Sequence, residues 1–176
     1  MTFKASQFIA CILSGLCLLT TTIASLCVLF SSHWIKYASG AHVGISQSAF
    51  TSLFSSGFIY TSSQWWCIGL LFGAFAFGVA ALVALGWAIL CACCILRFGA
   101  VLAAIFAFFQ FVCYLAAVMV FASMYNWTLP AGSDMDSAYI ASIVMIFISL
   151  IGSALAGYHH KSNSQKTFKA HGTNVV

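Results

Sequence analysis

The sequence predicts an all-α membrane protein, a bundle of four transmembrane helices with a small extracellular β-sheet in its first outer loop. Two observations predict the bundle. Hydrophobic residues make up 63% of the chain and charged residues only 5%, against the roughly one quarter that a soluble domain carries. The charged residues also leave four long uncharged stretches, each able to supply the roughly 20 apolar residues that cross a bilayer. We therefore expect lipid to surround most of the chain.

The gaps between charged residues define the domain organisation. The four predicted spans are residues 8–30, 66–90, 99–122 and 138–157. With the outer loops, residues 31–65 and 124–137, they form a single membrane domain over residues 1–160. Residues 161–176 form a polar, basic tail that we expect to be unstructured. The first apolar run is longer than the about 7–15 residues of a signal peptide, so we expect it to remain as a span.

The basic residues predict the orientation, because cytosolic loops are enriched in Lys and Arg. A cytosolic N-terminus places most of the six basic residues inside, namely Lys4, Arg97, Lys161, Lys166 and Lys169. Only Lys36 then lies outside, together with both acidic residues. We predict a multi-pass protein of the plasma membrane with N- and C-termini in the cytosol, and cell–cell junctions as a candidate location within it.

The first outer loop is rich in Ser and Thr and carries interspersed bulky residues such as Val43, Ile45, Phe50 and Tyr60. This mixture favours strands over helix, which predicts the extracellular sheet. Several aromatic residues lie at the outer ends of the predicted spans: Trp34, Trp65, Trp66, Tyr125 and Trp127. We interpret them as anchors at the lipid headgroups, where amphipathic rings are favoured.

Asp134 and Asp136 directly precede the fourth predicted span. Ser133 and Asp136 have the spacing of a capping box, in which Ser133 caps the helix and Asp136 stands three residues later. Negative charge is also stabilising at a helix N-terminus. Structural capping is the favoured interpretation, and a partner-binding or ion-binding role for the two acids is the alternative.

Within the spans, small residues predict close helix packing in one bundle. They occur four positions apart in Gly69-x3-Gly73, Ala74-x3-Gly78 and Gly152-x3-Ala156. Gln110 is the strongly polar side chain near the middle of the third span, and Tyr114 follows one turn later on the same face. Because an amide in lipid needs a hydrogen-bond partner on another helix, we interpret Gln110 as structural glue, with a transport pathway as the alternative.

The chain has eight cysteines, none in the body of an outer loop, so no extracellular disulfide framework is expected. Three cluster at the cytosolic end of the second span: Cys91, Cys93 and Cys94. We regard these as candidates for palmitoylation. Plain lipid-facing cysteines, a redox pair and a zinc site completed by His159 or His160 are the alternatives. A Cys27–Cys67 bridge near the outer boundary also stays open.

Little in the sequence indicates catalysis. It shows no nucleophile–base–acid arrangement, no carboxylate within a span and no glycine-rich phosphate loop. We therefore predict a non-enzymatic protein with no catalytic residues, bound cofactor, metal or nucleic-acid partner. Asn126 begins an N-glycosylation sequon in the second outer loop. It is a candidate acceptor that lies so close to the third span that we expect it to be unoccupied.

Four short motifs lie in the first outer loop and at the starts of the third and fourth predicted spans. Ser32-His33-Trp34-Ile35 follows the first span, and His42-Val43-Gly44-Ile45-Ser46 follows in the same loop. Arg97-Phe98 opens the third span, and Ser133-Asp134 through Tyr139 opens the fourth. With the four-span layout and the cysteine cluster, these motifs resemble the superfamily of claudins, peripheral myelin proteins and epithelial membrane proteins. Trp34 is similar to its outer Trp signature, and Gly44 to the glycine of its Gly-Leu-Trp motif.

The chain departs from that family in its first loop. Ala49 stands where the first of two family cysteines would fall, no second follows before Cys67, and Ser46 replaces the motif's Trp. The resemblance implies cell–cell contact, junctional barrier or membrane organisation through this loop. Because the loop has only Lys36 as a charge, an ion-selective pore fits less well.

Two alternatives to that function remain. The first is an auxiliary subunit of a channel or receptor complex, and the less favoured one is a small transporter or membrane thiol oxidoreductase. The expected partners are the lipid bilayer, other membrane proteins in the same or a facing membrane, and a second copy of the chain. The C-terminal Asn174-Val175-Val176 is also a weak match to a PDZ-domain ligand.

Overall fold

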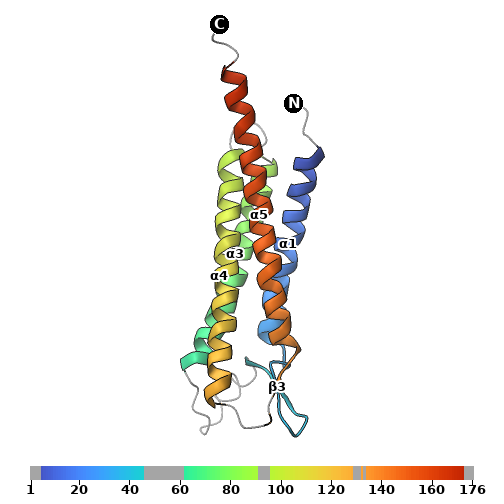
Figure 1. Ribbon diagram of the computed structural model, residues 1–176, viewed down its shortest axis with the longest axis vertical. Helices are drawn as coiled ribbons and strands as arrows, with labels where there is room; N and C mark the ends of the chain where they lie inside the picture. The colour runs from blue at the N-terminus through green and yellow to red at the C-terminus, as the bar shows by residue number, and fades with distance from the viewer. Residues whose placement is uncertain (1–4, 46–61, 91–95, 129–131, 133, 173–176) are drawn as a thin grey trace.

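The computed structural model describes residues 5–45, 62–90, 96–128, 132 and 134–172. Its helices are α1 (Ala5–Phe30), α3 (Ser62–Leu90), α4 (Leu96–Thr128) and α5 (Ser137–Gly172). Its strands, of two residues each, are β1 (Ile35–Lys36), β2 (His42–Val43) and β3 (Asp134–Met135). Figure 1 shows the helices running along a common axis, with the sheet at the end opposite both termini.

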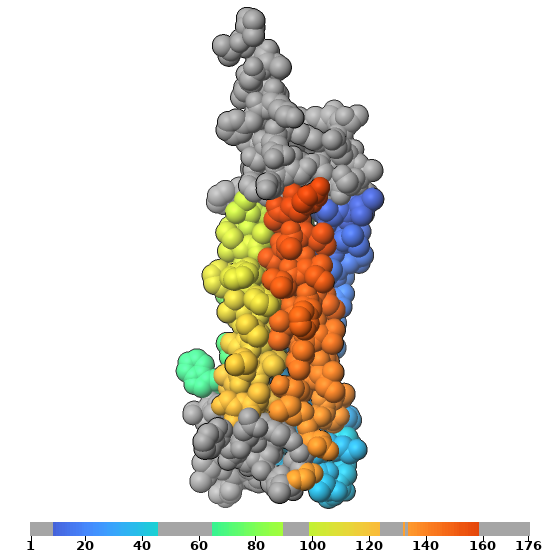
Figure 2. Space-filling view, in the orientation of Figure 1, coloured from blue at the N-terminus to red at the C-terminus, as the bar shows by residue number. Residues whose placement is uncertain are grey.

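The prediction of four helices long and apolar enough to cross a bilayer is confirmed. The qualifying segments are Ile9–Phe30, Trp65–Ile89, Gly99–Ser123 and Ser137–Tyr158, within one residue of the predicted spans at each end. Each helix packs against two neighbours, in the cyclic order α1, α3, α4 and α5. Helices α1 and α4 therefore face each other across the bundle. Figure 2 shows α4, α5 and α1 in that order along one face.

Small side chains take many of the buried positions of the bundle, and many large apolar ones face outwards. Eight buried residues of α3 and α4 are alanines, beside larger ones such as Leu71, Tyr114 and Phe121: Ala74, Ala81, Ala84, Ala88, Ala100, Ala103, Ala107 and Ala117. Large apolar residues such as Phe72, Val83 and Trp87 are more than half exposed. In water this arrangement would be unfavourable, whereas in lipid small residues let helices approach closely and large ones can face the acyl chains.

Two helices extend further than the sequence led us to expect. Helix α4 continues to Thr128, so the second outer loop starts later than the predicted Met124. Helix α5 continues to Gly172, so the prediction of an unstructured tail from residue 161 is wrong for most of that segment. No proline or glycine interrupts residues 158–171. Once a helix is nucleated, each added residue brings another hydrogen bond, so α5 can propagate beyond the bundle.

The sheet has the strand order β2-β1-β3, and both pairings are antiparallel. Strands β1 and β2 form a hairpin from the first predicted outer loop, which confirms that this loop contributes a small sheet. Gly40, at a φ of +82°, lies in its turn, where a left-handed backbone favours glycine. The third strand, from the segment before α5, was not predicted. Residues 46–61, which include Phe50 and Tyr60, lie outside the described part of the chain.

A polar cluster joins α1 to α4 across the centre of the bundle. Gln110 is fully buried, and the Thr21 hydroxyl donates to its Oε1 at 3.3 Å. The Tyr114 hydroxyl lies 2.8 Å from Ser25 Oγ and donates to the Thr21 carbonyl at 2.8 Å. The Thr21 contact supports the interpretation of Gln110 as structural glue, because in lipid it gives the amide oxygen a partner on another helix. The buried Nε2 of Gln110 has no hydrogen-bond partner among the described residues.

Gly78 of α3 lies against this cluster and has no room for a larger side chain. A Cβ added to Gly78 would meet Thr22 Oγ1 and lie 2.6 Å from Gln110 Nε2. By contrast, Gly69 and Gly86 of the same helix have nothing within 4 Å of such a Cβ. Of the small-residue motifs in α3, Ala74-x3-Gly78 therefore marks a close helix contact, whereas Gly69 does not.

Gly78→Ala should lower the free energy of unfolding by about 1–3 kcal/mol, because it forces the packed Thr22 and Gln110 side chains apart. Thermal denaturation of the full chain in detergent micelles measures the change.

Gly86→Ala is the matched control in the same helix. It should leave stability unchanged or raise it by up to about 1 kcal/mol, because alanine favours helix and the added methyl group meets nothing. Equal effects of the two substitutions would show that close packing at Gly78 does not matter.

Candidate functional site at the sheet end of the bundle

Trp34 joins the sheet to the helices by a hydrogen bond and a ring contact. Helix α1 ends at Phe30, and its last carbonyl groups lack partners within the helix. The indole Nε1–H of Trp34 donates to one of them, the Val28 oxygen, at 2.7 Å. The Trp34 ring is fully buried and lies 4.8 Å, centroid to centroid, from the ring of Phe121 in α4. One side chain thus caps α1 and fills the space between two helices.

The Trp34 backbone extends these contacts to both neighbouring strands. Its N–H donates to the Val43 oxygen at 3.2 Å, and its carbonyl accepts from the Asp136 N–H at 3.0 Å. The prediction that Trp34 anchors at the lipid headgroups is wrong, because its ring has no exposed surface. Trp65 and Trp66 are 48% and 68% exposed, as an interfacial anchor requires.

Gly44, the other residue carried by the family resemblance, is buried directly after β2. A Cβ at this position would collide with the Ser31 carbonyl oxygen and lie 2.9 Å from Ser32 Cα. Both atoms belong to the backbone that leaves α1, so they cannot move aside as a flexible side chain can. Glycine at position 44 therefore allows β2 to pack directly against the end of the first helix.

Three potential ligand side chains meet on the surface of the sheet: His33, His42 and Asp136. Their ligand atoms all lie within 4.8 Å of one another. His42 Nδ1 lies 2.5 Å from Asp136 Oδ2, and the two imidazole rings lie 4.7 Å apart between centroids. Both histidines are exposed and Asp136 is partly exposed. Imidazole and carboxylate together are the ligand types of many sites for divalent transition metals.

Asp136 also caps α5, which begins at the next residue. Its Oδ1 accepts from the Ser137 N–H at 2.7 Å, and its backbone carbonyl accepts from Tyr139 and Ile140. The Ser137 amide, and then the His42 ring, hold the pKa of the Asp136 carboxyl below its usual value. The predicted capping box, with Ser133 as the cap, would start the helix three residues before the observed Ser137, and Ser133 itself lies outside the described residues.

Of the other predicted site residues that the structure describes, none belongs to the cluster of His33, His42 and Asp136. Gln110 is in the centre of the bundle, and Asn126 is in the last turns of α4. Cys27 and Cys67 are both free thiols, so the structure contains no bridge between them. The palmitoylation candidates Cys91, Cys93 and Cys94 lie outside the described residues.

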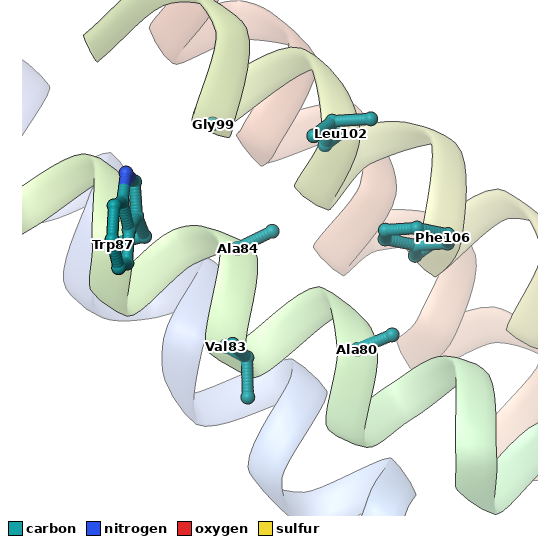
Figure 3. A pocket seen from close by; sticks show the side chains of 7 residues that line it. All are labelled: Ala80, Val83, Ala84, Trp87, Gly99, Leu102 and Phe106. Carbon is teal, nitrogen blue, oxygen red and sulfur yellow. The ribbon is translucent and has the colours of Figure 1, made fainter. Parts of the chain in front are cut away.

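A shallow groove of about 400 Å³ runs along the outer surface between α3 and α4 (Figure 3). Its lining is almost entirely apolar: Ala80, Val83, Ala84 and Trp87 from α3, and Gly99, Leu102 and Phe106 from α4. The groove lies within the two segments that can cross a bilayer. A lipid chain or another membrane helix therefore suits it better than a polar substrate.

Sequence reasoning did not identify His33 and His42 as potential ligands. His42 and Asp136 are 94 positions apart, so no short ligand-spacing motif joins them. The sequence did give one indication of this cluster. The predicted helix cap at Asp136 placed a carboxylate at the same end of the bundle as the loop that holds both histidines.

The chain was compared with known proteins by family model and by sequence. No protein-family model matches it, and no curated protein matches it. The short motifs around Trp34, Gly44, Arg97 and Asp134 are therefore what the resemblance to the claudin superfamily has in its support.

Gly44→Ala should lower the free energy of unfolding of the sheet end by about 1–3 kcal/mol or more, because the new methyl group overlaps fixed backbone. Limited proteolysis within residues 31–45 of the folded chain measures this local opening, which should become faster.

Gly40→Asn is the matched control in the same hairpin. Position 40 has open space around it, and asparagine tolerates a positive φ better than other residues with a side chain. Cleavage of Gly40→Asn should therefore stay near the unsubstituted rate. If proteolysis cleaves Gly44→Ala no faster than the unsubstituted chain, the proposed close approach of β2 to α1 is contradicted.

Proposed function

We propose that this chain is a non-enzymatic four-span membrane protein that acts in cell–cell contact, junctional barrier formation or membrane organisation. Its first outer loop carries that function, and both termini lie in the cytosol of a cell whose plasma membrane holds the bundle. The observation that carries the proposal is the fixed mounting of this loop on the helices through Trp34. Because residues 34–43 of the loop are held on the helices, this part of it can present the same surface to a partner each time.

The distribution of charge supports the orientation. The sheet lies at the end of the bundle opposite both termini (Figure 1). Lys4, Lys161, Lys166 and Lys169 belong to the terminal segments, and Arg97 lies at the start of α4, at the same end. The sheet end holds Lys36 with Asp134 and Asp136. Since basic residues favour the cytosolic side, this arrangement supports an outward-facing sheet.

The contacts of the sheet support its role as a rigid mount. Strand β1 pairs on one side with β2 and on the other with β3, which leads directly into α5. The Ala138 N–H at the start of α5 also donates to the His33 carbonyl at 2.9 Å. The loop is thereby joined to the first and the last helix of the bundle.

An auxiliary subunit of a channel or receptor complex is the second candidate. The apolar groove between α3 and α4 favours it, because a partner helix could pack against the small Ala80, Ala84 and Gly99 (Figure 3). Co-purification with a defined channel complex, with an altered current when the chain is removed, would favour this candidate over the first.

The contact proposal predicts where the protein accumulates in a cell layer. A fluorescently tagged full chain should concentrate at borders between expressing cells. Replacing residues 38–61 with a Gly/Ser segment of equal length should abolish this enrichment, because it removes the presented surface but leaves the four helices. Imaging together with surface labelling measures border enrichment against total surface protein.

Mixed layers of expressing and non-expressing cells test whether the partner in the facing membrane is a second copy of the chain. Enrichment limited to borders between two expressing cells indicates a second copy of the chain in the facing membrane. A variant truncated after Thr173, which lacks Asn174-Val175-Val176, is the control for a cytosolic PDZ ligand and should keep the enrichment. An even surface distribution of the unsubstituted chain would contradict the contact function.

A further inference from the structure

We propose that His33, His42 and Asp136 form a binding site for a divalent transition-metal ion such as Zn²⁺ on the surface of the sheet. The site goes beyond the proposed contact function, because it depends only on the geometry of three side chains. It would supply two imidazole nitrogens and one carboxylate oxygen, the ligand set of many zinc sites with one open position.

The distances fit this assignment after small side-chain movements. Zinc bonds of about 2.0–2.1 Å place the ligand atoms of a tetrahedral site about 3.3 Å apart. His42 Nδ1 and Asp136 Oδ2, which lie 2.5 Å apart, would move slightly apart. Ligand atoms that lie up to 4.8 Å from one another would move closer together. Both histidines are exposed, so their rings can turn without disturbing packed neighbours.

Hydrogen bonds outside the ligand set orient two of the three side chains. Asp136 Oδ1 is held by the Ser137 N–H, which directs Oδ2 towards His42. His33 Nδ1 lies 3.1 Å from Ser32 Oγ, which leaves Nε2 to bind the ion. Metal-ligating histidines commonly use their second nitrogen in this way, which fixes the ring and its tautomer.

The backbone brings the three ligand positions together before any ion binds. His33 and Asp136 flank the ends of β1 and β3, and their backbones are joined to α5 and to Trp34 by hydrogen bonds. His42 lies in β2, paired with Lys36, which in turn pairs with Asp134. The positive charge of Lys36 therefore has an acidic residue opposite it, which limits its repulsion of a cation.

Binding of the ion changes the tautomer of the His42 ring. A neutral His42 ring in close contact with the carboxylate carries its proton on Nδ1 and donates it to Asp136 Oδ2. When Zn²⁺ binds Nδ1 and Oδ2, the neutral ring carries its proton on Nε2 instead, so the number of protons on the ring is unchanged. The ion would then link the first outer loop to the start of α5.

Zn²⁺ titration of the full chain in lipid nanodiscs, followed by calorimetry at neutral pH, tests the proposal. The chain is purified without a polyhistidine tag and with Cys91→Ser, Cys93→Ser and Cys94→Ser, because thiols also bind zinc. We expect saturable binding of one Zn²⁺ per chain. His33→Ala, His42→Asn and Asp136→Asn should each weaken it by at least about tenfold, since even loss of a residue that supports a ligand costs that much.

The Asp136 variant distinguishes loss of a metal ligand from loss of the fold. Asp136→Asn removes the negative charge of the carboxylate that would bind the metal but retains a good helix cap, so thermal stability without metal should change little. A double variant, His159→Ala with His160→Ala, should bind Zn²⁺ as tightly as the background chain. Binding that survives the His42 and Asp136 variants, or that is lost in the tail variant, overturns the assignment. Absence of saturable binding in the background chain overturns it as well.

Discussion

The hydrogen bond from the Trp34 indole to the Val28 carbonyl is the contact on which the sheet end depends. It gives a second donor to the Val28 carbonyl, which also accepts from the Ser31 N–H at 3.3 Å, and it places a large ring against Phe121 of α4. Burying an aromatic ring of this size is worth about 3–5 kcal/mol against its loss to alanine. With the ring fixed, the backbone of residue 34 pairs with the Val43 carbonyl and the Asp136 amide, and the sheet forms around it.

The rest of the bundle follows a different constraint, which is close approach of helices through small side chains. Alanine and glycine fill many of the buried positions of α3 and α4, and Gly78 allows Gln110 to lie at the centre of the bundle. Gln110 and Tyr114 then reach α1 by hydrogen bonds, so the interior is held by shape and by a few polar contacts. The exposed apolar residues are free to contact lipid, whereas the potential ligand side chains His33, His42 and Asp136 meet at the sheet end.

The sequence predicted the helices well because crossing a bilayer demands both length and the absence of charge, and both can be read from a single chain. It predicted less of the sheet end. Strands of two residues carry no periodic signal, and β3 is close in the sequence to α5 but pairs with a strand almost 100 positions earlier. Trp34 looked like an interfacial anchor because its burial depends on Phe121, far along the chain. Asp136 was recognised as part of a helix cap, whereas its contact with His42 required the fold. The long α5 was missed because a polar composition suggested a free tail, although no proline or glycine lies between Gly157 and Gly172.

Hydrogen–deuterium exchange of the full chain in lipid nanodiscs tests most directly whether the sheet and the helix ends form one unit held by Trp34. In the unsubstituted chain, the hydrogen-bonded amides of residues 34–43 and 134–140 should exchange slowly and with similar protection. In Trp34→Ala both segments should lose protection together, while residues 100–117 inside the bundle should remain protected. Loss of protection in residues 34–43 alone, or unchanged exchange in both segments, would contradict the account.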